Sequence, residues 1–214
     1  MFKAFLLIAA FCFNPDFVSA QADWKPATNE KGIKVFVKNV PESRIKALKL
    51  ECELEAGLAQ VVALLLDVSS SDKWIPHTKS CVMIRQISPR ELIYYTEVSL
   101  PWPLYNRDFV SHMRIFQDPL TKVVTVDAPT MAGEVAPKKG IVRVNQSGGR
   151  WVLTPLKKER VKLDYTLVAD PGGIIPAPLV NYFASQEAIE SVKNMKKLLQ
   201  LAKYRNADIP FILK

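Results

Sequence analysis

The feature that most limits the fold of this 214-residue chain is the regular alternation of apolar segments and turn-forming residues in its middle part. Short segments separated by proline and glycine are typical of strands joined by tight connections, so residues 79–168 predict an antiparallel meander. The clearest turn is predicted at Gly148-Gly149, because a two-residue hairpin turn with positive φ favours glycine. The turn signals are Ser88-Pro89, Pro101-Trp102-Pro103, Asp118-Pro119, Pro137 with Gly140, and Gly148-Gly149.

The segments on either side of the meander add further elements. Residues 33–40 and 47–54 place apolar side chains at alternate positions, which predicts two more strands. Residues 58–67 form an apolar run of helical length, and Ser69 to Ser71 are expected to begin a second short helix. After a turn at 170–173 a long helix is predicted, because its apolar residues recur at helical spacings. Strands and helices in this order indicate an α+β fold. The apolar residues of the last helix are Tyr182, Ile189, Val192, Met195, Leu199 and Ala202.

The composition is that of one globular domain. The chain is 49% hydrophobic and 23% charged, which excludes an intrinsically disordered protein. Three cysteines are too few for a disulfide-rich scaffold. Cys52 and Cys81 lie in apolar, strand-like segments, where they form either a disulfide bond or two buried free thiols.

The first 20 residues are predicted to be a signal peptide rather than part of the domain. Lys3 precedes an apolar run over 4–13, and Val18-Ser19-Ala20 provides small residues for cleavage. A membrane anchor would need about 20 apolar residues, whereas this run is followed by Asp16. We therefore expect a signal peptide at 1–20 and a domain at 21–214 that is periplasmic or secreted.

The formal net charge is +8, and cleavage would leave it unchanged because residues 1–20 contain one lysine and one aspartate. Nucleic acid is not an expected partner of an exported protein. A transient contact with an anionic membrane surface is one explanation of the charge, and solubility alone is the other. We expect a monomer.

Motifs for nucleophilic catalysis and for metal binding are absent from the sequence. His77 and His112 do not stand in an H-E-x-x-H pattern, and no C-x-x-C or G-x-S-x-G occurs. We therefore expect no catalytic residue, no metal and no cofactor. His112 lies in an apolar strand, where a hydrogen-bonded structural role is the usual one.

The segment from Arg107 to Phe116 mixes charged and apolar residues, so neither face of the predicted strand is plainly exposed. A charge enclosed by a sheet needs a partner, because an unpaired buried charge is strongly destabilising. Glu97 and Asp108 are candidate partners of Arg107 and Arg114. The sequence leaves open whether this is a polar site in a cavity or a set of solvated edge charges.

Three separated motifs in this order resemble the START family of lipid-transfer domains. They are 97–110 (EVSLPWPLYNRDFV), 139–144 (KGIVRV) and 170–181 (DPGGIIPAPLVN). The resemblance implies a helix-grip fold, in which a curved antiparallel sheet surrounds a long C-terminal helix and an internal cavity holds one lipid. It also implies that Arg107 either reaches a lipid headgroup phosphate or braces the fold.

The favoured hypothesis is an exported, non-enzymatic protein that binds or transfers one lipid, namely a phospholipid, a sterol or a fatty acid. Opening near residues 101–106 and at Gly172-Gly173 is expected to admit the lipid, because proline and glycine mark both segments. For each apolar candidate an ordinary filled core is the alternative. The candidate ligand contacts are the polar residues Arg107, Arg114 and Glu97, and the lining residues Tyr95, Phe109, Met113, Tyr182 and Val192.

Two other hypotheses stay open. Helix-grip proteins include cyclases and hydrolases, so the chain could be an enzyme that uses His112 with Asp108 or Glu97 as acid and base. Alternatively, the interior is an ordinary core, and the basic surface of a stable scaffold recruits a partner.

Overall fold

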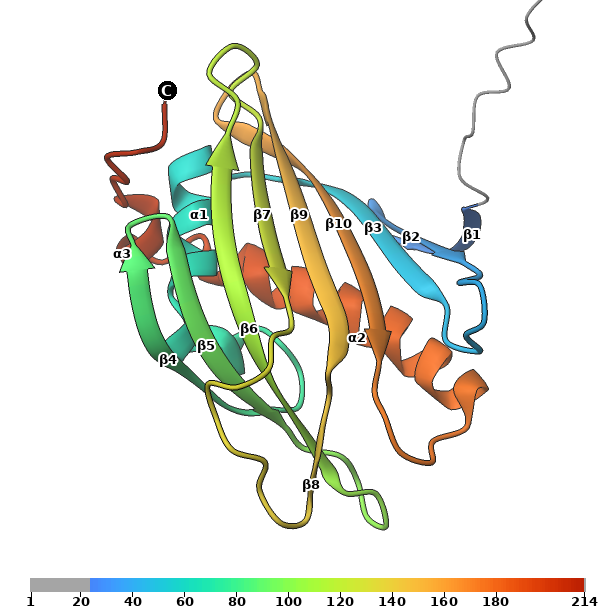
Figure 1. Ribbon diagram of the computed structural model, residues 1–214. Coiled ribbons are helices and arrows are strands. Elements are labelled where there is room, and N and C mark those ends of the chain that lie inside the picture. Colours follow the sequence, from blue (N-terminus) through green and yellow to red (C-terminus); the bar gives the residue numbers. More distant parts are fainter. Residues whose placement is uncertain (1–23, 214) are drawn as a thin grey trace, which may run out of the picture.

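The computed structural model describes residues 24–213 and shows one large curved sheet with a long helix packed across its inner face (Figure 1). This arrangement confirms the α+β, helix-grip architecture expected from the sequence. The predicted signal peptide, residues 1–20, lies outside the described residues. In the part of the chain that is described, no helix is both long enough and apolar enough to cross a bilayer.

The elements follow the order expected from the sequence, with an additional first strand. The predicted last helix ends at Leu198, and Ala202 begins a separate short helix. The strands are β1 (Lys25–Glu30), β2 (Ile33–Lys38), β3 (Ala47–Leu54), β4 (Thr78–Ser88), β5 (Glu91–Val98), β6 (Asn106–Gln117), β7 (Val124–Pro129), β8 (Ile141–Arg143), β9 (Gln146–Leu156) and β10 (Arg160–Asp170). The helices are α1 (Leu58–Leu66), the 3₁₀ helix η1 (Val68–Lys73), α2 (Ala177–Leu198) and α3 (Ala202–Arg205).

The sheet is a meander in which the last strand, β10, pairs with β3 near the beginning of the chain. Its order is β1-β2-β3-β10-β9-β7-β6-β5-β4, with β8 paired in parallel to β6. Helices α1 and η1 carry the chain from β3 to the far edge, where β4 begins. The strands from β4 to β10 then return across the sheet until β10 pairs with β3. The predicted antiparallel meander is therefore confirmed.

The hairpin turn predicted at Gly148-Gly149 is wrong. Both glycines lie inside β9, where Gly149 pairs with Leu167 of β10. A Cβ atom on Gly149 would lie only 3.0 Å from the ring of Trp151 and 3.3 Å from the ring of Tyr165. Glycine is needed here because two aromatic rings, 4.8 Å apart at their centres, lie over the strand. The hairpin turn of this region joins β9 to β10 instead, between Leu156 and Arg160, where two residues have positive φ.

One end of the molecule is tightly packed. Leu64 of α1, Met195 of α2 and Leu199, which follows α2, are almost fully buried in the main core. Asp67, after α1, accepts hydrogen bonds from Tyr204 Oη of α3 at 2.7 Å and from Ser70 Oγ at 2.8 Å. These bonds fix α3 against the junction of α1 and η1, so the C-terminal segment closes this end.

The two cysteines of the described residues are both free and buried. Cys81 Sγ lies 3.2 Å from Thr96 Oγ1 of the neighbouring strand. Burial raises the pKa of Cys52 to about 11, so this thiol stays protonated at neutral pH. Of the two interpretations left open by the sequence, the structure has the free thiols.

Candidate functional site

Side chains alternate between the two faces of β5 and β6, and this alternation decides which candidates approach helix α2. Tyr94 of β5 and Met113 of β6 belong to the core that includes Val192 of α2, so they define the inner face. Tyr95 and Val110 form a separate cluster on the opposite, outer face. The loop after β7 covers that cluster through Met131 and Val135.

The structure divides the predicted ligand contacts between these faces. Arg107, Phe109 and Met113 lie on the inner face, and Val192 packs against the core from α2. Tyr182 of α2 is exposed and makes an edge contact with Phe183. Glu97, Tyr95 and Arg114 lie on the outer face, away from helix α2. These three residues do not border the space between sheet and helix, because alternation along β5 and β6 turns them the other way.

Arg107, at the beginning of β6, holds two loops together. Its guanidinium donates hydrogen bonds to the carbonyl oxygens of Tyr105, of Pro171 at 3.3 Å and of Gly172 at 3.1 Å. The side chain is only 5% exposed, and burial lowers its pKa. A Cβ on Gly173, which has positive φ, would lie 3.2 Å from the guanidinium. Of the two roles implied by the family resemblance, bracing is the one that these contacts perform.

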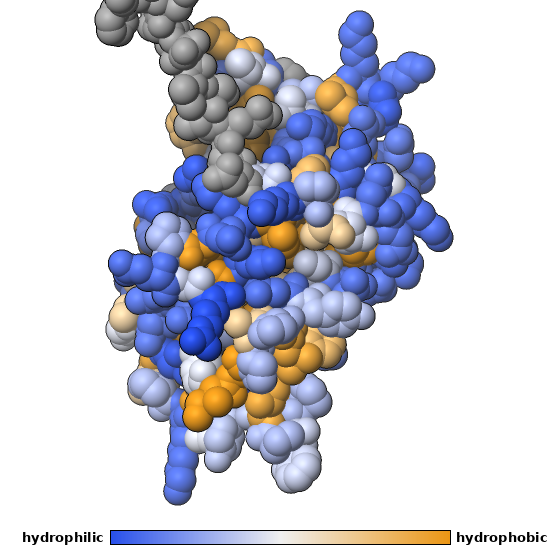
Figure 2. Space-filling view, turned by 90° about the vertical axis from the view of Figure 1, so that its right-hand side faces the viewer, coloured by the Kyte–Doolittle hydropathy of each residue, from blue (hydrophilic) through white to orange (hydrophobic). Residues whose placement is uncertain are grey.

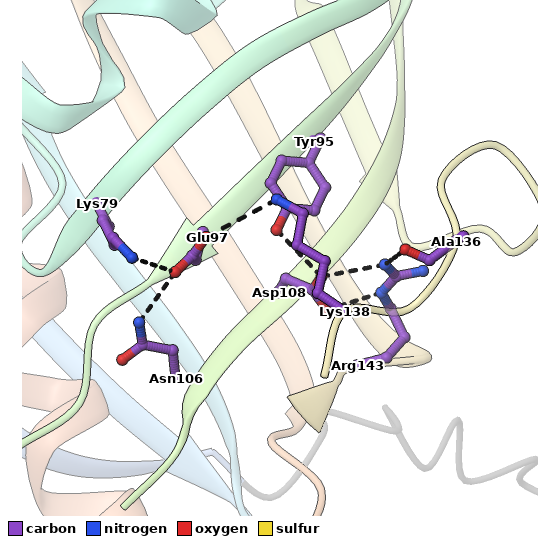
Figure 3. Close-up of polar contacts among 8 residues, drawn as sticks. All are labelled: Lys79, Tyr95, Glu97, Asn106, Asp108, Ala136, Lys138 and Arg143. Carbon is purple, nitrogen blue, oxygen red and sulfur yellow. Dashed lines mark hydrogen bonds and ion pairs between the residues drawn. The ribbon is translucent and has the colours of Figure 1, made fainter. Parts of the chain in front are cut away.

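Asp108, the next residue, points to the outer face and binds Arg143 through two hydrogen bonds of 2.7 and 3.0 Å (Figure 3). The Tyr95 hydroxyl donates a third bond to this carboxylate at 3.1 Å. Burial would raise the pKa of Asp108, but the hydrogen bonds from Arg143 and Tyr95 outweigh it and lower the pKa. Arg143 also donates to the carbonyl of Val135 at 2.8 Å, so the ion pair fastens the loop after β7 to the sheet.

Glu97 belongs to the same outer-face cluster. Its carboxylate accepts hydrogen bonds from Lys79 Nζ at 2.8 Å and from Asn106 Nδ2 at 2.9 Å (Figure 3). The bond from Lys79 is the main reason that the pKa of Glu97 is lowered. Lys138 lies 4.0 Å from Glu97 and its ammonium stands 4.3 Å from the centre of the Tyr95 ring. The cluster therefore adds two further contacts that hold the loop after β7.

The residues of the enzymatic hypothesis do not meet in the interior. His112 Nε2 lies 2.6 Å from Glu91 Oε1 on the outer face. Asp108 and Glu97 are on the same face but are occupied by Arg143 and Lys79. This arrangement gives His112 a structural partner. Within residues 24–213, no three side chains of His, Cys, Asp or Glu gather where they could hold a metal ion.

The inner face carries residues that the sequence analysis did not select. Trp151 of β9 and Tyr165 and Leu167 of β10 pack on the core but keep part of their surface accessible. Burial raises the pKa of Tyr165 well above its usual range, and Tyr94 lies close enough to add to this effect. Alternation within β10 could have grouped Tyr165 with Leu167, but their proximity to Trp151 depends on strand pairing.

An open groove lies outside the sheet, between the turn that joins β2 to β3 and the first turns of α2. Its volume is about 760 Å³. An adjoining groove of about 380 Å³ shares Asn39 and Lys46 with it. The first groove is lined by Asn39, Ser43, Arg44, Lys46, Ala177, Pro178 and Asn181, and the second by Lys25, Val37, Lys38, Asn39 and Lys46.

Comparison with known proteins places this geometry in a family. An uncharacterized protein of Pseudomonas aeruginosa is 29% identical over 193 residues, which are 89% of this chain and 93% of the relative. The phosphatidylcholine transfer protein of Mus musculus is 26% identical over 183 residues, 84% of this chain and 85% of the relative. A STAR-related lipid transfer protein fragment from Xanthomonas axonopodis has the same fold, with a TM-score of 0.77 and 29% identity over 83% of this chain and 99% of that chain. Residues 13–205 match the START domain model, and the chain therefore belongs to the START domain family.

Proposed function

We propose that this protein holds one lipid between the inner face of the sheet and the N-terminal half of helix α2, and that it transfers this lipid between membranes without catalysing a reaction. The START family generally binds or transfers lipids, and two relatives carry lipid transfer in their names. The proposed cargo is a phospholipid, a sterol or a fatty acid. The protein acts as a monomer that contacts an anionic membrane transiently.

One observation carries this proposal. Trp151, Tyr165 and Leu167 face the interior and yet retain accessible surface. Burial also raises the pKa of Tyr165, which agrees with its position on the inner face. We place the lipid against these side chains, because an inner wall that is only partly packed leaves apolar surface for a ligand to cover. Helix α2 packs directly on β2 and β3, and its C-terminal half shares the main core with β6, β9 and β10, so the proposed space lies beside its N-terminal half.

A lined space of this kind solves the physical problem of lipid transfer. A two-chain lipid crossing water exposes about 30 methylene groups at about 0.8 kcal/mol each. An apolar wall removes most of that cost while the lipid travels. The loops at 99–105 and 171–176, which Arg107 joins, are the segments that must separate to admit the lipid. A cross-link between α2 and the sheet is expected to block uptake.

The test is native mass spectrometry of the protein purified from its own host, followed by extraction of the bound lipid. Ala184 of α2 packs on the core, whereas Gln186 is exposed. Ala184→Trp is expected to lower the lipid-bound fraction several-fold, and Gln186→Trp is the matched control. Circular dichroism verifies folding, and Ala184→Leu replaces the larger substitution if it fails to fold. Wild-type protein that neither carries nor takes up a lipid would refute the proposal.

Export is a separate part of the proposal and rests on the sequence pattern of residues 1–20. Mass spectrometry of the N-terminal peptide is expected to find Gln21 as the first residue of the protein from its own host. A chain that begins at Met1 and stays in the cytoplasm would contradict this part and would leave lipid binding unaffected.

A further inference from the structure

Charged side chains are nearly absent from the inner face of five neighbouring strands. Because side chains alternate along each strand, β5, β6, β7, β9 and β10 turn a single charged residue, Arg107, toward that face. Its guanidinium already binds three carbonyl oxygens of the loops. The other charged residues of these strands point outward, where hydrophilic side chains cover much of the surface, as Figure 2 shows for one face of the molecule. The inner face therefore offers no free counter-charge to a charged lipid headgroup.

Helix α2 supplies no counter-charge beside the proposed lipid either. Its lysines, at positions 193, 196 and 197, all lie in its C-terminal half, and Lys193 binds Glu30 of β1 at 2.8 Å. In the N-terminal half, burial raises the pKa of Glu187, whose Oε1 lies 3.8 Å from His77 Nε2. A carboxylate repels an anion. An anionic headgroup would therefore bury its charge without a partner, which is strongly unfavourable.

The inner face does offer hydroxyl groups, and Tyr165 of β10 carries one of them in a fixed direction. Its ring extends over Gly149 of β9, where a Cβ atom would lie 3.3 Å from it. The ring also packs against that of Trp151, with 4.8 Å between the ring centres. The glycine leaves room for the ring and the tryptophan supports it, so the hydroxyl is held over the middle of the sheet.

The Tyr165 hydroxyl is free to bind a ligand. Unlike the hydroxyls of Tyr95 and Tyr204, it has no hydrogen-bond partner among residues 24–213. Three side-chain polar atoms of these residues are completely enclosed without a partner, and Tyr165 Oη is not one of them. The oxygen therefore keeps accessible surface, in agreement with the partial accessibility of the whole side chain. An unpartnered donor on an inner wall is suited to a polar group of the cargo.

Two more hydroxyls lie on the same face. Burial is the main cause of the raised pKa of Tyr165, and Tyr94 of β5 is close enough to add to it. Ser111 of β6 lies directly opposite Tyr94 in the strand pairing. Burial also raises the pKa of Tyr94 well above its usual range, so both phenols stay neutral and can donate a hydrogen bond. Neutral hydroxyls of this kind match a ligand group that both donates and accepts without carrying a charge.

We infer that Tyr165 Oη anchors the polar group of the bound lipid, and that this group is an uncharged hydroxyl. The inference rests on the proposed function and narrows its cargo to a lipid alcohol. The alcohol is either a sterol or a linear chain with a hydroxyl end, and the shared chemistry is the hydroxyl. Fatty acids and phospholipids fall outside this class, because each would bring an ionised group into a wall that cannot pair with it.

The test offers the delipidated protein an equimolar mixture of probes and quantifies the bound molecules by extraction and mass spectrometry. Oleyl alcohol, oleate and octadecene have chains of equal length and differ in their polar end, which is a hydroxyl, a carboxylate or absent. Phosphatidylcholine and cholesterol complete the set. At about pH 8, where a carboxyl group is ionised, oleyl alcohol is expected to be bound about 30-fold more than oleate.

Tyr165→Phe removes only the hydroxyl from the proposed anchor. It is expected to lower the ratio of bound oleyl alcohol to bound octadecene about five-fold, the equivalent of one neutral hydrogen bond. Tyr95→Phe is the matched control, because it removes a hydroxyl from the outer face, and it is expected to leave the ratio unchanged. A ratio of two ligands on one sample does not depend on the folded fraction. Tyr94→Phe provides a second variant on the inner face, with a smaller effect expected.

The cholesterol arm distinguishes the two sources of the hydroxyl. A loss of bound cholesterol with Tyr165→Phe would assign a sterol, and a loss confined to oleyl alcohol would assign a linear lipid. Equal binding of oleate and oleyl alcohol, preferential binding of phosphatidylcholine, or ratios that ignore Tyr165→Phe would overturn the inference and leave the carrier standing. A protein that binds none of the probes and carries no lipid from its own host would contradict the proposed function as well.

Discussion

Replacement of Arg107 with methionine tests the clamp between the β5–β6 loop and the β10–α2 loop. The substitution keeps most of the side-chain volume and removes the hydrogen bonds to the carbonyls of Tyr105, Pro171 and Gly172. A hydrogen bond to a charged group contributes about 1.5–3 kcal/mol. The loss of this hydrogen-bond free energy is partly offset, because the variant no longer buries a charge and the loop carbonyls can bind water.

These terms together predict that Arg107→Met lowers the free energy of unfolding by about 3 kcal/mol. With a denaturant slope of about 3 kcal/mol per molar urea for a chain of this size, the midpoint moves down by about 1 M. Hydrogen exchange should speed up at the amides of Leu104 and Gly172, which lie in the two loops. Exchange in the loop after β7 should not change, because Asp108 and Arg143 fasten that loop from the other face.

The matched control is Arg143→Met, which should release the loop after β7 and leave the two clamped loops protected. A variant at Arg107 that unfolds at the wild-type urea concentration would refute the clamp. Faster exchange in the loop after β7 than in the clamped loops would refute it equally, because the effect would then be a general loss of stability.

Three further predictions concern other parts of the structure. Burial would raise the pKa of Asp67, but hydrogen bonds from Lys203 and Tyr204 outweigh it and lower the pKa, so this carboxylate stabilises the fold above its unfolded pKa of about 3.9. Asp67→Asn should therefore cost about 2 kcal/mol at pH 7 in urea unfolding, and the difference should shrink as the pH falls below about 4; a constant difference would contradict this. Cys52 and Cys81 should resist alkylation in the folded protein and react once urea unfolds it, as peptide mass spectrometry can show. Gly149→Ala should lower stability by about 1–3 kcal/mol and reduce the bound lipid, because the new Cβ meets Trp151.

Local patterns were sufficient to predict most of the fold. The strand predicted at 47–54 has those bounds in the structure, since its apolar residues share one parity and face one core. The helix predicted over 58–67 ends one residue earlier, at Leu66. The error at Gly148-Gly149 has a physical cause: a glycine pair is equally compatible with a turn and with a strand over which aromatic rings pass. Only the partners Trp151 and Tyr165 distinguish these cases, and the second of them lies on another strand.

The candidate site was harder to predict. A strand pattern fixes which residues share a face, but β6 has apolar residues on both faces because the loop after β7 covers the outer one. Met113 and Arg114 therefore looked equally suited to face inward. The loop after β7, which is distant in sequence, covers Tyr95 and Val110. The two faces of β5 and β6 therefore lack the usual contrast between polar and apolar residues, and no local signal revealed this.

The tightly packed end and the partly accessible inner wall of the sheet are subject to two different evolutionary constraints. Substitutions near Leu64, Met195 and Leu199 act on the part of the core that determines whether the chain folds. Substitutions at Trp151 or Leu167 alter a wall with accessible surface, so under the proposed function they change lipid preference with little change in folding. If the proposed function holds, related chains can diverge in the lipids they bind while the closed end stays the same. A combinatorial library confined to Trp151, Tyr165 and Leu167 would exploit this separation to select binders of new molecules.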